Sequence, residues 1–385
     1  MTAPTLWNRR QALTGLLCAP GLATAQTTLQ APPLMPPFTP PPFQRRALQF
    51  PRDFGSHPDS RTEWWYMTGW LRDEQGQMLG FQITFFRSRV DTAQSLRSRL
   101  AARQLLIAHA AVTDLSTQTF AHEQSMTRWD GQSEGPSERA FASTADTHVR
   151  MPGWTLEREP SGRYTTALAQ GDLHMRLTAA PTQAVLLQGE AGWSRKGPEP
   201  TQASFYYTQP QLAVEGVVTV KGRRQQVSGQ AWLDHEWSEA LLHPEAVGWD
   251  WTGMNLLDGG ALTAFRLRRA DGSTLWTGGS YRPAAAAQNP SPPMVFGPEA
   301  LVFTPLREWV SPATQIRYPV DWRIDTPAGD FELRTLMDAQ ELDSRATTGA
   351  IYWEGLSQLY RPGNPEAIGR GYLEMTGYGE RIRLG

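Results

Sequence analysis

The chain has 385 residues, which is long enough for two domains that each bury a core of their own. A formal net charge of -2 and a charged fraction of 19% exclude a global basic field that would hold a nucleic acid or an anionic membrane. The 30 Pro, 34 Gly and 15 Trp favour many short strands over helical bundles. The Trp count is unusually high, and a functional account must explain it.

The first segment predicts export. Residues 1–25 contain the pair Arg9-Arg10, then an apolar run, then a small-x-small cleavage site that ends at Ala25, which together resemble a signal peptide of twin-arginine type. The only cysteine, Cys18, lies inside this segment. We therefore expect a periplasmic or secreted mature chain with no disulfide and no thiolate metal site. No second long apolar segment follows, so we expect no transmembrane segment in it.

The next segment, residues 26–49, is rich in proline. It is predicted to be an extended tether, because it cannot pack as a helix or as a central strand. Beyond it, period-two segments bounded by turn residues recur along the chain, and only residues 95–106 show convincing helical periodicity. The chain is thus predicted to be all-β, with few short helices.

Two parts of the sequence echo each other. The aromatic segment 65–69, which ends in Thr-Gly, is similar to the segment 249–253. Later in each half, segments 229–234 and 369–374 share the pattern Gly-x-x-aromatic-Leu-acid. The order is the same in both halves, so the sequence predicts two related β units.

The two units are predicted to be barrels. Up-and-down antiparallel strands that share a first and a last element most economically close on themselves, which removes exposed edges. We expect two antiparallel barrels in tandem, the N-terminal one over residues 50–244 and the C-terminal one over residues 245–385. The indoles of the echoed motifs are expected to line or close the barrel interiors.

Several motifs together resemble one family. They follow in order over nearly the whole mature chain, at residues 57–66, 80–87, 108–114, 229–237, 318–322, 352–355 and 369–374. They resemble the AttH and carotenoid 1,2-hydratase family, which implies two lipocalin-like barrels in tandem. For function, the resemblance implies hydration of an isolated carotenoid double bond, the shaping of polyene cyclisations, or the role of the exported bacterial members that are encoded beside ABC transporter permeases.

The run Asp234-His235-Glu236-Trp237 is the strongest candidate for chemistry. On a strand, alternation sends Asp234 and Glu236 to one face and His235 and Trp237 to the other. An inward His beside a Trp can protonate an alkene while the indole stabilises the developing cation, and the resemblance implies catalytic roles for both. The structural alternative is that Asp234 and His235 form a hydrogen-bonded pair that fixes a barrel corner.

The resembled hydratases also use a Tyr-x-Asp pair on a strand further along the chain. The corresponding strand here is residues 261–267, and it has neither residue. This departure weighs against carotenoid hydration.

Two further carboxylates are catalytic candidates. Glu63 enters an aromatic strand, and an apolar cavity would raise its pKa and suit it to general acid work. The alternative is that Arg61 or another arginine pairs with it at the barrel rim. Asp250 has the same ambiguity, because its neighbours Trp249 and Trp251 share one strand face while Asp250 takes the other.

Aromatic side chains are the candidate ligand-binding residues, and they can hold a polyene or an acyl chain or simply fill a small barrel. They are Trp64, Trp65, Tyr66, Trp232, Trp249 and Trp251. His57, His109 and His235 show no metal-site spacing, so we expect no metal and no cofactor. The sequence also lacks a Gly-x-Ser-x-Gly elbow, a P-loop and a dinucleotide fingerprint.

Two functions follow as hypotheses. The first is an exported, non-catalytic lipocalin-like protein that binds an apolar ligand (a lipid, isoprenoid or polyene) and serves an ABC transporter system. The second is a hydratase or isomerase-type enzyme that acts on an isoprenoid or polyene by acid catalysis. In the second, the groups that transfer the proton would be His235 and an acid among Asp234, Glu63 and Asp250. Neither function involves a nucleic acid.

Overall fold

The computed structural model describes residues 38–98, 100–135, 138–240, 242–284 and 292–381. The predicted signal peptide, residues 1–25, lies outside them, as does the first part of the predicted tether. The regular secondary structure of the described chain consists of strands and two short 3-10 helices, η1 (Arg52–Phe54) and η2 (Asp91–Ala93). The prediction of an all-β fold with few short helices is confirmed.

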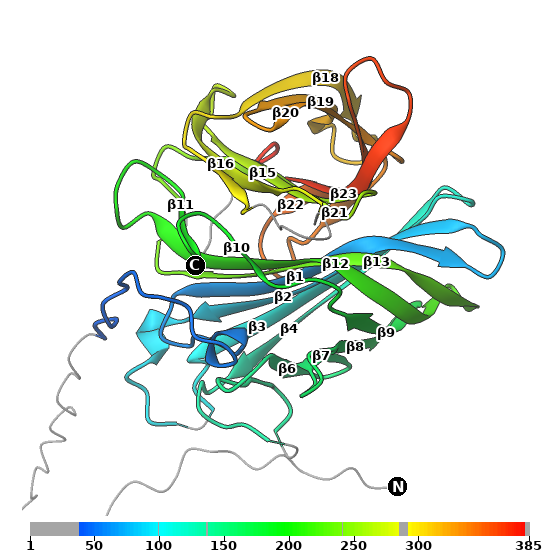
Figure 1. Cartoon of the computed structure of the whole chain (residues 1–385). Coiled ribbons are helices and arrows are strands. Elements are labelled where there is room, and N and C mark those ends of the chain that lie inside the picture. Colours follow the sequence, from blue (N-terminus) through cyan, green and yellow to red (C-terminus); the bar gives the residue numbers. More distant parts are fainter. Residues whose placement is uncertain (1–37, 99, 136–137, 241, 285–291, 382–385) are drawn as a thin grey trace, which may run out of the picture. The chain divides into compact units, whose positions relative to one another are not determined.

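All described strands belong to two antiparallel sheets, which lie one above the other in Figure 1. The first sheet consists of β1 (Thr62–Asp73), β2 (Met78–Arg89), β3 (Gln104–Asp114), β4 (Thr119–Trp129), β5 (Phe141–Ala142), β6 (His148–Met151), β7 (Trp154–Arg158), β8 (Tyr164–Gln170), β9 (Leu173–Ala180), β10 (Leu186–Leu187), β11 (Trp193–Arg195), β12 (Ala203–Val220) and β13 (Arg223–Ser238). The second consists of β14 (Gly248–Leu256), β15 (Ala261–Arg268), β16 (Thr274–Arg282), β17 (Met294–Phe296), β18 (Val302–Val310), β19 (Arg317–Thr326), β20 (Gly329–Thr335), β21 (Glu341–Asp343), β22 (Ile351–Tyr360) and β23 (Ala367–Met375).

Each sheet pairs its first strand with its last. β1 lies between β2 and β13 in the first sheet, and β14 lies between β15 and β23 in the second. The sequence echo therefore marks corresponding strands, because it falls on β1 and β14 at the start of each sheet and on β13 and β23 at the end. This pairing bends both sheets into barrel-like forms (Figure 1).

Four clusters of buried apolar side chains fill the described part of the fold, and the smallest consists of Ala111, Leu342 and Tyr352. One packs inside the first sheet and includes Trp65 and Trp237, and a second packs inside the second sheet and includes Trp322. The third lies between the sheets and includes Trp232 and Trp251. The indoles of the echoed motifs thus do not all line barrel interiors as expected, since those of the third cluster hold the two sheets together.

The described residues form one compact unit. The division into separate domains at residues 244 and 245 stays a prediction. The described end of the predicted tether has no helix or strand, and Phe43 packs on the first sheet, with ring centroids 5.5 Å from Trp193 and 5.3 Å from Phe205. None of the helices in the described ranges has the length and apolarity needed to cross a membrane.

The helix expected over residues 95–106 is wrong. The described residues before Gln104 in this segment form turns and irregular chain, and β3 begins at Gln104. Leu96 and Leu100, which gave the helical period, are 51% and 67% exposed, so they have no surface to pack against. A helix this short is only marginally stable without such packing.

Gly69 lets β1 approach β13 closely. A Cβ atom at this position would lie 2.2 Å from the carbonyl oxygen of Gln230 and 2.8 Å from the Cα of Ala231. Both contacts are to backbone, so the strand pair would have to separate. We expect Gly69→Ala to lower the free energy of unfolding in urea by about 1–3 kcal/mol.

Gly297→Ala is the matched control, because a Cβ there meets nothing within 4 Å. It should change the free energy of unfolding by less than about 0.5 kcal/mol. Equal effects of the two substitutions would contradict the close approach of β1 and β13.

Candidate functional site

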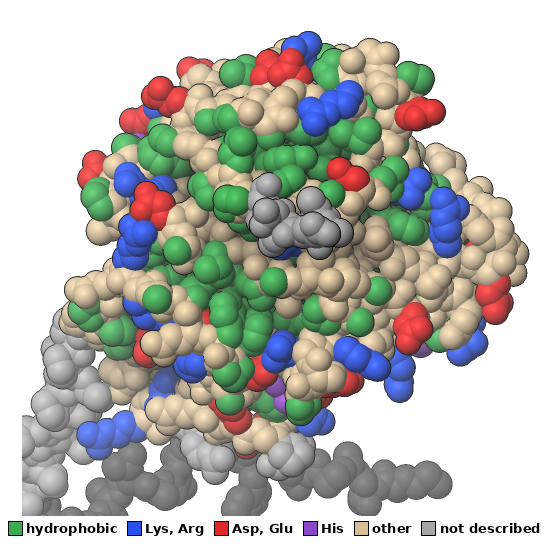
Figure 2. Space-filling view, in the orientation of Figure 1, with side chains coloured by type: hydrophobic (Ala, Val, Ile, Leu, Met, Phe, Trp, Pro, Cys, Tyr) green, Lys and Arg blue, Asp and Glu red, His purple; other side chains and the backbone are tan. Residues whose placement is uncertain are grey.

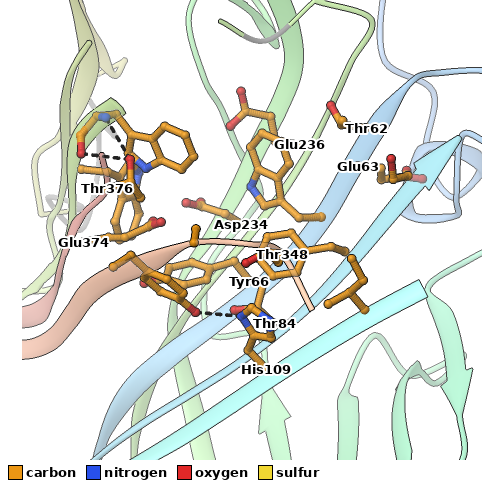
Figure 3. Close-up of a pocket in the computed structure, with 18 of the residues that line it drawn as sticks. Thr62, Glu63, Tyr66, Thr84, His109, Asp234, Glu236, Thr348, Glu374 and Thr376 are labelled. Atoms are coloured by element: carbon orange, nitrogen blue, oxygen red, sulfur yellow. Dashed lines mark hydrogen bonds between the residues drawn. The ribbon is translucent and has the colours of Figure 1, made fainter. Parts of the chain in front are cut away.

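A cavity of about 290 Å³ lies between the two sheets. Its walls come from β1, β2, β3, β12 and β13 of the first sheet and from β14, β15, β22 and β23 of the second, and Figure 3 shows side chains that line it. The apolar lining residues are Trp64, Tyr66, Phe86, Leu105, Ile107, Tyr206, Leu242, Trp249, Trp251, Phe265, Leu267 and Tyr352. From outside, hydrophobic side chains gather on the visible face near the level where the sheets meet (Figure 2). The size and lining are those of a small-molecule site.

Alternation along β1 and β13 decides which side chains reach this cavity. Tyr66 pairs with Asp234, and both line the cavity. The neighbouring pair, Trp65 with His235, points into the core of the first sheet. The predicted separation of Asp234 and Glu236 from His235 and Trp237 is confirmed, and the acidic face is the one that meets the cavity.

The opposite face of β1 and β13 carries a buried ionic network centred on Glu63. Its Oε1 atom accepts hydrogen bonds from His57 Nδ1 at 2.8 Å and from His235 Nε2 at 2.9 Å, and its Oε2 atom accepts one from Arg87 Nε at 2.7 Å. Burial alone would raise the pKa of Glu63, but Arg87 and the two imidazoles hold it well below the usual value. Of the two alternatives for Glu63, the raised pKa is therefore not found, and the pairing with an arginine holds, with Arg87 as the partner.

The side chains of His57, Glu63 and His235 form a group that could hold a metal ion, since one ligand atom from each lies within 4.8 Å of the others. Sequence spacing gave no sign of this group, because strand pairing brings the residues together. The carboxylate of Glu63 already accepts hydrogen bonds from both imidazoles and from the buried guanidinium of Arg87. The hydrogen-bonding capacity of the Glu63 carboxylate is thus filled by donors of the protein.

His235 and Trp237 are packed among aromatic rings. The His235 ring stacks on Trp65 with centroids 4.6 Å apart, and its Nδ1 atom lies 3.0 Å from the Tyr207 hydroxyl. Trp237 stacks on His57 with centroids 3.6 Å apart. Burial lowers the pKa of His235 to about 4. Neither ring lines the cavity, so their catalytic role stays a prediction, and the hydrogen-bonded Asp234–His235 pair is not formed.

Asp234 lies in the cavity wall among neutral donors. It accepts hydrogen bonds from Tyr206 Oη at 2.6 Å, from Thr208 Oγ1 at 2.5 Å and from Trp232 Nε1 at 2.8 Å. Burial raises the pKa of Asp234 to about 7, although these three donors work in the opposite direction. Trp232 thus orients Asp234 and packs between the sheets, and it is not part of the cavity lining.

Glu354 and Glu374 form a carboxyl pair on the opposite wall. They are direct cross-strand partners in β22 and β23, and both line the cavity. Burial raises the pKa of Glu374 to about 8, and burial together with the charge of Glu374 raises the pKa of Glu354 well above its usual value. Two carboxyls this close resist double ionisation, so the pair holds a proton near neutral pH.

Glu236 differs from the other acids of the cavity because it has a cationic partner. Lys196 Nζ lies 3.0 Å from Glu236 Oε1, and Ser204 donates a hydrogen bond to the same carboxylate. The Lys196 ammonium also lies 4.1 Å from the ring centroid of Phe265 and 4.8 Å from that of Tyr206. This corner of the cavity already holds a cation over aromatic faces.

The remaining predicted residues divide between the two faces of β14. Trp249 and Trp251 line the cavity, together with Trp64 of β1. Asp250 points into the second sheet, where it pairs with Arg266 at 2.6 Å and accepts a hydrogen bond from Tyr378 Oη at 2.8 Å. The predicted alternation of this run is confirmed, and Asp250 lies away from the cavity.

Sequence reasoning did not assign Glu354, Glu374 or Lys196 to a site. A signal was present for Glu374, because it is the acid that ends the second echoed segment, as Asp234 ends the first. His109 was considered only as a metal ligand, and it joins the sheets through hydrogen bonds to Tyr352 Oη at 2.9 Å and Thr347 Oγ1 at 2.8 Å (Figure 3).

Comparison with known families agrees with this arrangement. The AttH-like family model matches residues 41–378. The chain belongs to the AttH-like family. A crystal structure of a protein from Nitrosomonas europaea assigned to AttH is 43% identical, with a TM-score of 0.78, and the match covers 89% of this chain and 100% of that one.

Two more distant AttH-like folds are 15% identical to this chain. Kievitone hydratase from Nectria haematococca has a TM-score of 0.64, with 86% of this chain and 93% of that chain covered. CghA, solved with Sch210972, has a TM-score of 0.52, with 84% and 89% covered. These likenesses show a shared fold. Among curated proteins, none is significantly similar in sequence.

The Glu63 network yields a stability prediction. Glu63→Gln leaves the buried guanidinium of Arg87 without its counter-charge, and we expect a loss of about 3–5 kcal/mol in the free energy of unfolding at neutral pH. Because the folded-state pKa of Glu63 is lowered, its stabilisation is present above the usual value of 4.5 and is lost as the pH falls. The difference between wild type and variant should therefore shrink in acid.

The measurement is urea unfolding of both proteins at several pH values. Glu366→Gln is the control, because Glu366 is an exposed carboxyl group far from the network, and it should leave stability unchanged. A Glu63→Gln protein as stable as wild type at neutral pH would show that the network does not hold β1 in place.

Proposed function

We propose that the cavity binds an apolar, unsaturated small molecule and that its buried carboxyl groups protonate a double bond of that molecule. The observation that carries the proposal is the Glu354–Glu374 pair, which retains a proton near neutral pH and faces an aromatic cavity. A carboxylic acid with a pKa near the working pH is an effective general acid. The indoles of Trp64 and Trp251 can stabilise the positive charge that develops on carbon.

The proposed reaction is acid-catalysed addition of water. A proton moves from Glu374 to one alkene carbon, and the positive charge forms on the other carbon. A water oxygen bonds to that carbon, and one proton of the water passes to the ionised carboxylate of Asp234. Asp234 then gives up a proton to solvent and Glu374 regains one, so that the net change is the addition of one water. If the intermediate loses a neighbouring C–H proton instead, the product is an isomerised alkene.

Asp234 is the second acid of this proposal. It faces the cavity from the opposite sheet, and its three hydrogen-bond donors fix its carboxyl group in place. With a pKa raised to about 7 by burial, it can accept the proton of the attacking water. That one protein of the same fold is a hydratase agrees with this reaction class and does not identify the substrate.

A binding role without catalysis is the second candidate. The strand β15 presents Phe265 and Leu267 to the cavity and carries no Tyr-x-Asp pair, which favours an apolar carrier over carotenoid hydration. In this role the protein would be exported to the periplasm or secreted, and it would pass a lipid, isoprenoid or polyene to an ABC transporter permease. The carrier accounts for the aromatic lining and leaves the protonated acids unexplained.

Two probes test the proposal. Retinol, a conjugated polyene, reports binding by quenching Trp fluorescence. Farnesol, an isoprenoid alcohol, reports protonation when it is incubated in D2O, because protonation on carbon followed by loss of a different proton leaves deuterium in the molecule, and hydration adds one D2O. Both products are read by mass spectrometry.

We expect Glu374→Gln and Glu354→Gln to bind retinol as wild type does and to lose at least about tenfold in the rate of deuterium incorporation or hydration. Both variants should fold, because they remove a repulsion between carboxyl groups. The wild-type rate should fall as the pH rises through about 8, the pKa of Glu374, since the acid must be protonated to act.

Glu366→Gln should leave binding and rate unchanged. Binding of the probes without any deuteration or hydration by wild type would favour the carrier and overturn catalysis. Absence of binding for both probes would contradict an apolar-ligand site altogether.

A further inference from the structure

The cavity has an excess of acidic groups over basic ones. Of the five carboxyl groups among its lining residues, Glu236 forms an ion pair with Lys196, and Glu63, at one end of the cavity, forms one with Arg87. Asp234, Glu354 and Glu374 form no ion pair with any of the described residues. A wall with this excess is electrostatically suited to an occupant that carries positive charge.

Two polar atoms in the cavity wall lack a well-formed hydrogen bond within the described chain. They are the Oε1 atom of Glu354, which is 2% exposed, and the hydroxyl of Tyr66. Burial raises the pKa of both groups, and the hydroxyl of Tyr66, the neighbour of Glu354 in the wall, interacts weakly with its carboxyl group, which raises the pKa of Tyr66 further and opposes the rise for Glu354. Buried polar atoms are normally paired, so an unsatisfied carboxylate oxygen that faces a cavity marks a place for a ligand group.

The aromatic lining of the cavity also favours a positively charged ligand. Lys196 shows how the cavity holds a cation, with its ammonium over the rings of Phe265 and Tyr206 and beside the Glu236 carboxylate. Two indole rings also lie beside Glu374: Trp249 donates a hydrogen bond to its carboxyl group, and Trp251 is its direct cross-strand partner. Aromatic faces beside a carboxylate form the type of cage that binds quaternary ammonium groups.

We infer that the cavity binds alkylammonium ligands, with the cationic head beside Glu354 and Glu374 and the apolar chain along the aromatic lining. The inference rests on the proposed function in one respect, because the same cavity is assigned to an apolar ligand. It adds that the cavity accepts a permanent positive charge as well as one that develops during a reaction.

Binding of a permanent cation should displace a proton. The charge favours the ionised form of the Glu354–Glu374 pair, so the proton that the pair shares leaves as the ligand enters. The titratable and charged groups that line the cavity around the pair or lie close to it are Tyr66, His109, Lys196, Tyr206, Asp234, Glu236, Tyr352 and Tyr372, together with the ion pair of Glu63 and Arg87. Asp234 and Glu236 reinforce the preference for a cation, whereas Lys196 is already neutralised by Glu236.

The test compares (hydroxyhexyl)trimethylammonium with its neutral isostere, in which a carbon atom replaces the nitrogen. Isothermal titration calorimetry in two buffers of different ionisation enthalpy measures both the affinity and the number of protons released. We expect the ammonium to bind wild type at least about tenfold more tightly than the isostere, with release of a proton near neutral pH.

Glu354→Gln and Glu374→Gln should each lose about tenfold in affinity for the ammonium and keep their affinity for the isostere, while Glu366→Gln should leave both affinities unchanged. Equal affinity of wild type for the two probes would overturn the inference, as would an equal loss in Glu366→Gln. These results are independent of the proposed function, whose failure is read from retinol binding and farnesol deuteration.

Discussion

The pairing of β1 with β13 places two opposite chemistries on the two faces of one strand pair. Residues 64–66 and 234–237 alternate between the cavity between the sheets and the core of the first sheet. The core face is anchored by Glu63, which is bonded to Arg87 and to His235. If the register between β1 and β13 shifted by one residue, the side chains that now face the core would face the cavity, and the reverse. The site therefore depends on this register.

Two equally buried acids, one in the core of the first sheet and one in the cavity, have pKa values that are shifted in opposite directions. Glu63 is fully buried beside a guanidinium, and its pKa is held below the usual value. Glu354 is just as buried but faces Glu374, and its pKa is raised. Partner charge, more than depth, thus decides which carboxyl group anchors the fold and which holds a proton for chemistry.

Much of the fold follows from local patterns. The all-β class and the alternation at 234–237 come from period-two sequence, and the echo between β1 and β14 correctly marked the first strand of each sheet. The cavity could not be predicted, because it forms between the outer faces of sheets that are distant in sequence. For the same reason, the pairing of Glu354 with Glu374 and the grouping of His57 with His235 had no local signature. The helix expected at 95–106 failed because local periodicity does not supply a packing surface.

The protonation state of the cavity acids is the most direct test of the proposed chemistry. Carboxyl-carbon NMR of protein labelled with ¹³C at Asp and Glu, recorded as a function of pH, reports each ionisation. The structure predicts a carboxyl signal that is still protonated at neutral pH and titrates near 8, and that disappears in Glu374→Gln but persists in Glu366→Gln. If every Asp and Glu carboxyl is ionised at neutral pH, the cavity holds no proton to donate, and acid catalysis between the two sheets is contradicted.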